Sequence, residues 1–165
     1  MAVGVSPRLK TFPYVGCSRY FLTQCAHGRA KLFVSPDVVS GILLQIRLSG
    51  SRLGVAILAY CFMPDHLHLL VEGTSVTSDF LAFSAAAKQR SGHWYAEACG
   101  RRLWQRGFYD RVLRAEEDTM GVCRYIWHNP VRAGLVESPA DYAFSGSDVF
   151  PFPACLEDIG IRQRR

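Results

Sequence analysis

The sequence predicts an α+β domain in which helices cover an open antiparallel sheet, and two observations lead to this fold class. Apolar runs of strand length alternate with segments of helical spacing, and two of the strands follow each other across a tight turn. The chain has 165 residues, of which 49% are hydrophobic and 20% charged, enough for one compact core. We therefore expect one domain over 1–165, with an N-terminal extension (1–17), a core (18–147) and a C-terminal tail (148–165).

The first elements are a strand and a helix. Residues 19–26 are aromatic and rich in β-forming residues, so they predict a strand. The apolar residues of 36–48 follow helical spacing, and Pro36 suits the first turn of a helix. Gly50 and Ser51 are expected to end this helix.

A hairpin follows. The apolar run 55–62 has the length of a strand, and residues 63–65, Met-Pro-Asp, have the composition of a turn. Residues 66–72 then return as the second strand of the hairpin.

The second half of the chain predicts a helix over 77–98 that ends at Gly100, a fourth strand within 103–113, and a helix over 116–129 with acidic residues in its first turn. The resulting order, β-α-β-β-α-β-α, is that of a ferredoxin-like fold with an additional C-terminal helix. In this fold the first and third strands lie in the centre of the sheet.

Composition favours a polyanionic partner and a reducing compartment. The formal net charge is +5, which raises the expectation of nucleic acid. The six cysteines include no Cys-x-x-Cys pair, so neither a zinc ribbon nor a thioredoxin-like redox site is indicated. No signal sequence or membrane-spanning segment is recognised, and we expect a cytoplasmic protein, either monomer or homodimer, without a membrane partner.

The third strand carries His66 and His68 inside an apolar run. Because strand side chains alternate between faces, the two imidazoles point the same way and Leu67 and Leu69 point the other way. Two imidazoles on one face form half of a metal site, with positions open for a third ligand and a substrate oxygen. The alternative is that both histidines are partly buried strand residues with satisfied hydrogen bonds.

The last helix carries a candidate nucleophile, Tyr125. Tyr125 and Asn129 are one turn apart on a stripe that also contains Val122 and Ile126. A tyrosine can attack a phosphodiester, and the amide oxygen of Asn129 would suit Mg²⁺ or Mn²⁺ as a third ligand. Two alternatives stay open: Tyr125 is a core residue, and Asn129 caps a short turn that begins at Pro130, in which case His128 is the neighbouring donor.

Three blocks of the chain together form a family pattern. These are Met63-Pro-Asp-His-Leu-His-Leu-Leu70, Trp104-Gln-Arg-Gly-Phe-Tyr-Asp-Arg111 and Arg124-Tyr-Ile-Trp-His-Asn-Pro-Val-Arg-Ala-Gly-Leu135. In this order they resemble the REP-associated tyrosine transposases of the His-hydrophobic-His endonuclease superfamily, and the resemblance runs from about residue 18 to 147.

The resemblance implies roles for individual residues. His66 and His68 would be ligands of a divalent metal, Mg²⁺ or Mn²⁺; Tyr125 would be the nucleophile; and Asn129 would complete the metal site. The implied activity is a single-stranded DNA endonuclease and transesterase. It would cleave and rejoin hairpins of repetitive extragenic palindromes through a 5′-phosphotyrosine.

Basic and aromatic residues are the candidate contacts to DNA, because guanidinium groups bind phosphates and rings stack on unpaired bases. The candidates are Lys88, Arg90, Arg101, Arg102, Arg106, Tyr109, Arg111, Arg114 and Arg132. Two other functions stay open: a ferredoxin-like module that binds nucleic acid without covalent chemistry, and a metal phosphoesterase that uses water.

Overall fold

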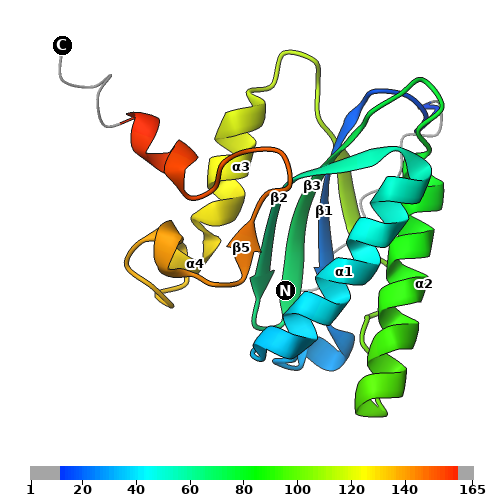
Figure 1. Ribbon diagram of the computed structural model, residues 1–165, viewed down its shortest axis with the longest axis vertical. Helices are drawn as coiled ribbons and strands as arrows, with labels where there is room; N and C mark the ends of the chain where they lie inside the picture. Colours follow the sequence, from blue (N-terminus) through cyan, green and yellow to red (C-terminus); the bar gives the residue numbers. More distant parts are fainter. Residues whose placement is uncertain (1–11, 160–165) are drawn as a thin grey trace.

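The structure is a computed structural model that describes residues 12–159, and within this range it contains a five-stranded antiparallel sheet (Figure 1). In chain order the helices and strands are β1 (Arg19–Cys25), α1 (Pro36–Leu53), β2 (Val55–Met63), β3 (His66–Gly73), α2 (Phe80–Cys99), β4 (Tyr109–Val112), α3 (Thr119–Trp127), α4 (Asn129–Arg132) and β5 (Ser145–Gly146). Short 3-10 turns lie at His27–Arg29, Pro139–Asp141 and Ala154–Ile159. The predicted order of strands and helices is confirmed.

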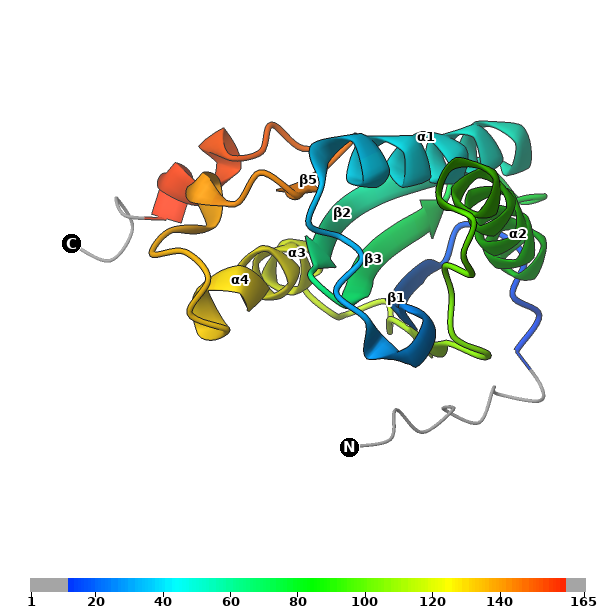
Figure 2. The same ribbon diagram turned by 90° about the horizontal axis from the view of Figure 1, so that it is seen from below.

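The strands lie in the order β4-β1-β3-β2-β5, so β1 and β3 are in the centre as the ferredoxin-like arrangement requires. Helices α1 and α2 lie side by side on one face of the sheet, and α3 lies on the other face (Figure 2). Leu67 and Leu69 of β3 are buried among residues of α1 and α2, whereas Leu70 is buried with residues of α3. Each face of β3 therefore contributes to a separate apolar cluster.

Helix α1 continues five residues beyond its predicted end, to Leu53. Gly50 and Ser51 do not break it, because Gly50 is there for close packing: a Cβ at this position would lie 2.6 Å from the backbone oxygen of Val55. The helix ends instead at Gly54, whose φ of 64° is left-handed and favours glycine.

The fourth strand is shorter than predicted and covers only 109–112. Residues 103–105 run beside the end of β1, since Leu103 accepts a hydrogen bond from the His27 N–H and Gln105 donates one to Cys25. Between 105 and β4 the backbone leaves the sheet, and Gly107 has a left-handed φ of 77°. The carbonyl oxygens of Gln105 and Gly107 accept hydrogen bonds from Lys88 Nζ at 2.8 and 2.9 Å and from the Gln24 amide.

Both flanking regions of the core pack against it. Tyr14 of the expected N-terminal extension stacks on Tyr20 and Phe80, and Phe152 of the expected tail lies with its ring 4.8 Å from that of Trp127 in α3. Residues 160–165 of the expected C-terminal tail lie outside the described residues. In the described part of the chain, no helix combines the length and hydrophobicity needed to cross a membrane.

Candidate active site

The two histidines of β3 point toward each other on the face of the sheet that α3 covers. Their Nε2 atoms are 3.1 Å apart, and the two rings are nearly perpendicular. The predicted common face is therefore confirmed. The two Nε2 atoms are within hydrogen-bond distance, so one donates to the other when no metal is bound, and a metal ion held by both nitrogens would replace this bond.

The other nitrogen of each ring is held by a neighbouring side chain. His66 Nδ1 is 2.6 Å from Asp65 Oδ1, and His68 Nδ1 is 3.0 Å from Thr23 Oγ1. The second oxygen of Asp65 accepts from Arg29 Nε at 3.0 Å. This arrangement is typical of metal-binding histidines, because a hydrogen bond at one nitrogen fixes the tautomer that leaves the other nitrogen free to coordinate.

Asp65, Thr23 and Arg29 are not predicted from the sequence. Asp65 directly precedes His66 in the turn, and this adjacency was the one feature of the sequence that could have indicated a contact between the two side chains. Thr23 lies directly opposite His68 in the pairing of β1 with β3, a register that becomes visible only in the folded sheet.

The spacing of the two nitrogens fits one metal ion. With metal–nitrogen distances of about 2.1 Å, two ligands at a right angle are separated by about 3.0 Å. Within residues 12–159 no group of three or more His, Cys, Asp or Glu is arranged to hold a metal. A further protein ligand would therefore have to be a residue of another type, and the candidate from the sequence is Asn129.

Electrostatics favour the neutral form of His68. Burial first, and then the nearby His66, Arg132 and Arg29, together lower the pKa of His68 to about 3. His68 is therefore uncharged at neutral pH, which is the form of imidazole that binds metal ions.

Tyr125 is 55% exposed, so the alternative that it is a core residue is wrong. The Phe21 ring stacks on His68 with a centroid distance of 5.7 Å and meets the Tyr125 ring edge-on at 6.4 Å. On Tyr125 itself, Arg132 places its guanidinium 4.3 Å from the ring centroid and donates to the Tyr125 carbonyl at 2.7 Å. The Phe21 ring thus contacts both His68 and Tyr125 and links the nucleophile candidate to the histidine pair.

Asn129 is the first residue of α4, and His128 occupies the cap position expected for Asn129. Its amide nitrogen donates to the carbonyl oxygens of Tyr125 and Ile126, both at 3.1 Å. The amide oxygen accepts no hydrogen bond from the described residues. His128 Nδ1 lies 2.8 Å from the carbonyl oxygen of Arg124, so this ring nitrogen is engaged within the helix.

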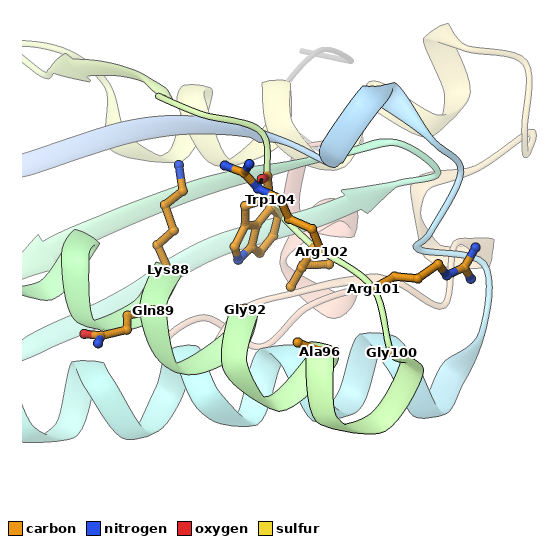
Figure 3. A pocket seen from close by; sticks show the side chains of 9 residues that line it. Lys88, Gln89, Gly92, Ala96, Gly100, Arg101, Arg102 and Trp104 are labelled. Atoms are coloured by element: carbon orange, nitrogen blue, oxygen red, sulfur yellow. Dashed lines mark hydrogen bonds between the residues drawn. The ribbon is translucent and has the colours of Figure 1, made fainter.

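The candidate DNA contacts lie in several separate places. Lys88, Arg101 and Arg102 line a hollow between α2 and the segment that follows it (Figure 3). The Lys88 and Arg102 side chains extend toward the same edge, whereas Arg101 extends away from them. Burial and then the charge of Arg102 lower the pKa of Lys88, and Arg102 Nε donates to the Trp104 carbonyl at 3.0 Å.

The other candidates differ in exposure. Arg90 lies between α1 and α2, 3.5 Å from Gln45 Oε1, whereas Arg106 and Arg114 are exposed. Arg111 pairs with Glu117 at 2.6 Å. Tyr109 is half-buried and lines a pocket together with Phe21 and Tyr125.

Comparison with known proteins gives consistent matches. The family model of IS200-like transposases matches residues 17–129. A Haemophilus influenzae protein with the provisional name REP-associated tyrosine transposase is 24% identical over 137 residues, covering 76% of this chain and 77% of that protein. The REP-associated tyrosine transposase of Escherichia coli is 30% identical over 88 residues, which are 53% of this chain and 51% of the relative.

The fold is also found among solved structures. A REP-associated tyrosine transposase bound to a REP hairpin has a TM-score of 0.69 and 22% sequence identity, over 85% of this chain and 82% of that protein. The similarity shows that the two chains share this α+β architecture.

Proposed function

The chain belongs to the family of IS200-like transposases, and on this premise we propose that it cuts and rejoins single-stranded DNA with Tyr125 as nucleophile. The observation that carries the proposal is an exposed tyrosine next to two imidazoles whose Nε2 atoms converge. A module that only binds nucleic acid would not need this combination. The family membership makes the chain an enzyme that acts on DNA, and the tyrosine and metal chemistry is our proposal.

The reaction exchanges one phosphodiester for another. The Tyr125 phenol loses its proton to water, and its oxygen bonds to phosphorus while the bond from phosphorus to the 3′ oxygen breaks. The leaving 3′ oxygen takes up a proton, and a 5′-phosphotyrosine remains. Attack by a 3′-hydroxyl reverses these steps and rejoins the DNA without an external energy source.

Arg132 is the proposed positioning residue for the nucleophile. Its guanidinium contacts the Tyr125 ring and the Tyr125 carbonyl together, so it restrains a side chain that is otherwise exposed. The same guanidinium contributes to the low pKa of His68, which indicates that it lies close to the histidine pair as well. A phosphate between Tyr125 and the histidines would therefore meet a positive charge.

His66 and His68 would hold a divalent metal, Mg²⁺ or Mn²⁺, through Nε2, and Asn129 is the proposed third ligand through its amide oxygen. When bound, the metal supplies positive charge beside the non-bridging oxygens of the phosphate. The support for Asn129 is indirect: its amide nitrogen donates within the helix, and its oxygen accepts no hydrogen bond from the described residues.

We propose DNA hairpins of repetitive extragenic palindromes as substrates, which places the reaction in the cytoplasm. The names of the relatives and the REP hairpin bound by the structural neighbour support this substrate. Exposed cations such as Arg101, Arg102 and Arg106 are the proposed phosphate contacts. Lys88 already donates to two backbone carbonyls, so its proposed role is to fix the segment that carries Arg106.

The test is a covalent-adduct assay. Wild-type protein is incubated with Mn²⁺ and a hairpin with a single-stranded flank, labelled on the strand that stays with the tyrosine, and the products are separated on a denaturing gel. We expect a protein-linked band that Tyr125→Phe eliminates. Tyr60→Phe is the matched control, since Tyr60 is a half-buried tyrosine on the opposite face of the sheet, and it should leave the adduct unchanged.

Cleavage by Tyr125→Phe at the wild-type rate, without an adduct, would favour a water-dependent phosphoesterase. If wild-type protein bound the hairpin and never cut it, the nucleic-acid-binding module would be the better description.

A further inference from the structure

A pocket of about 460 Å³ opens between β1, β4 and α3, directly beside Tyr125. It is lined by the rings of Phe21, Tyr109 and Tyr125 together with Arg111, Asp118 and Gly121. Resting on the proposed function, we propose that this pocket holds one unpaired nucleobase next to the scissile phosphate. Its volume is within the range of small-ligand sites.

The rings leave room for a flat ligand. Arg132 contacts the ring of Tyr125 and is not among the pocket residues, so the pocket meets Tyr125 on a part that Arg132 does not cover. Phe21 is already stacked on His68, and Tyr109 from β4 is half-buried. Unpaired bases stack on rings of this kind irrespective of their sequence, because every base has a π-face.

Gly121 keeps the side of the pocket formed by α3 open. A Cβ at Gly121 would lie 2.7 Å from Asp118 Oδ2, so a side chain here would enter the space in front of that carboxylate. The backbone of Gly121 is helical and has no positive φ, so conformational need does not explain the glycine. The glycine allows the Asp118 carboxylate to lie close to the α3 backbone at the edge of the pocket.

The charges of the pocket favour a base over a phosphate. Glu117 and Asp118 contribute two carboxylates against the single guanidinium of Arg111. The pKa of Glu117 is lowered by hydrogen bonds from the backbone N–H of Arg114 and from Arg111, so Glu117 is ionised at neutral pH. A phosphate would be repelled here, whereas the N–H groups of a base edge can donate to a carboxylate.

Asp118 is the acceptor that the base would find. Its Oδ1 accepts from the N–H of Met120 at 3.0 Å and caps α3. Its Oδ2 accepts no hydrogen bond from residues 12–159 and lies beside Gly121. The proposed ligand is therefore a base with an exocyclic amino group, because that group supplies a donor on its edge.

The experiment is an abasic scan of a hairpin with single-stranded flanks. Each flank nucleotide in turn is replaced by an abasic residue, and the Kd is measured by fluorescence anisotropy with Tyr125→Phe protein, which retains the ring and cannot form the adduct. The same series is measured in this background with Tyr109→Ala, which removes one ring, and with Gly121→Leu, which fills the pocket. Tyr60→Ala is the control, a half-buried ring outside the pocket.

At one flank position the abasic replacement should weaken binding about 5- to 100-fold in the parent protein and in Tyr60→Ala. In Tyr109→Ala and in Gly121→Leu the effect at that position should fall to within twofold. Gly121→Leu displaces the Asp118 side chain as well as filling the pocket, so the fold of both variants is checked by circular dichroism. Tyr109→Leu covers the case in which either variant does not fold, because it removes the ring and keeps an apolar side chain. At the coupled position, removal of the exocyclic amino group of the base, for example purine in place of adenine, should cost about tenfold in the parent. The loss should be smaller in Asp118→Asn, which keeps a capping side chain.

If no flank position depends on Tyr109 or Gly121, while the wild-type protein forms the Tyr125 adduct with the same hairpin, the pocket is overturned and the proposed function stays intact. Absence of hairpin binding by every variant and by the wild type would overturn both.

Discussion

Asp65→Asn tests whether the hydrogen bond on the outer nitrogen of His66 prepares that ring for metal. Asp65 presents two oxygens, one to His66 Nδ1 at 2.6 Å and one to Arg29 Nε at 3.0 Å. Asparagine has a single oxygen, so either His66 or Arg29 loses its acceptor. The substitution also removes the negative charge that strengthens the bond to His66.

The expected size of the effect follows from the kinds of bond involved. A hydrogen bond that includes a charged group contributes about 1.5–3 kcal/mol, and a neutral one about 0.5–1.5 kcal/mol, so the change from charged to neutral is worth about 1 kcal/mol. We expect Mn²⁺ to bind Asp65→Asn about fivefold more weakly, and Asp65→Ala about 10- to 100-fold more weakly. Thr23→Val removes the neutral bond to His68 and should cost about two- to tenfold.

Mn²⁺ affinity is measured by isothermal titration calorimetry on protein without DNA. The matched control is Asp148→Asn, because Asp148 is also paired with an arginine, Arg47, and its side chain is 29% exposed compared with 24% for Asp65. The control should bind Mn²⁺ within twofold of the wild type. If Asp65→Asn and Asp65→Ala also stayed within twofold, the carboxylate would not position His66 and this reasoning would be refuted.

Three further predictions concern the same site. His66→Ala and His68→Ala should each lower DNA cleavage at least about 100-fold, and EDTA should do the same to the wild type, whereas retained cleavage in the double variant would make the histidines structural. Below pH 6.5 the unfolded chain protonates His68 while the folded chain resists until about pH 3, so stability should fall as the pH is lowered through this window. Urea unfolding in EDTA at pH 7 and pH 5 should show a loss about 1–2 kcal/mol larger for the wild type than for His68→Ala. The protein should bind a hairpin with a single-stranded flank more tightly than a duplex of equal length, and its affinity should fall about tenfold or more from roughly 50 to 200 mM salt. Equal affinities that do not depend on salt would exclude nucleic acid as the partner.

The first three strands were predictable to within one residue, whereas the helix ends differ from the prediction by up to five residues. The hairpin of β2 and β3 is an example, because alternation of side chains and the Pro64-Asp65 turn are both local signals. The length of β4 was not predictable. The segment ahead of β4 is bound by Lys88 and Gln24, which are distant in sequence from the two carbonyls that both contact.

The candidate site divides in the same way. The shared face of His66 and His68 follows from strand periodicity, and that prediction is confirmed. The contact of Thr23 with His68 depends on the register of β1 against β3, which strand periodicity within one segment does not determine. The pocket beside Tyr125 is still harder to predict from the sequence, because its rings come from β1, β4 and α3 and meet only in the folded chain.

The candidate site and the larger apolar cluster lie on opposite faces of the sheet. On β3, Leu67 and Leu69 pack under α1 and α2 while the histidines point to the opposite face, so the site can change without opening that core. Helix α3 repeats the division within two turns: Ile126 and Trp127 are fully buried and hold the helix on the sheet, and Tyr125 stays exposed. Removal of the Tyr125 hydroxyl should therefore cost little stability, since no described residue hydrogen-bonds to it and the ring contacts with Phe21 and Arg132 stay in place. A loss of cleavage in Tyr125→Phe would consequently report on the chemistry of the hydroxyl and not on the fold.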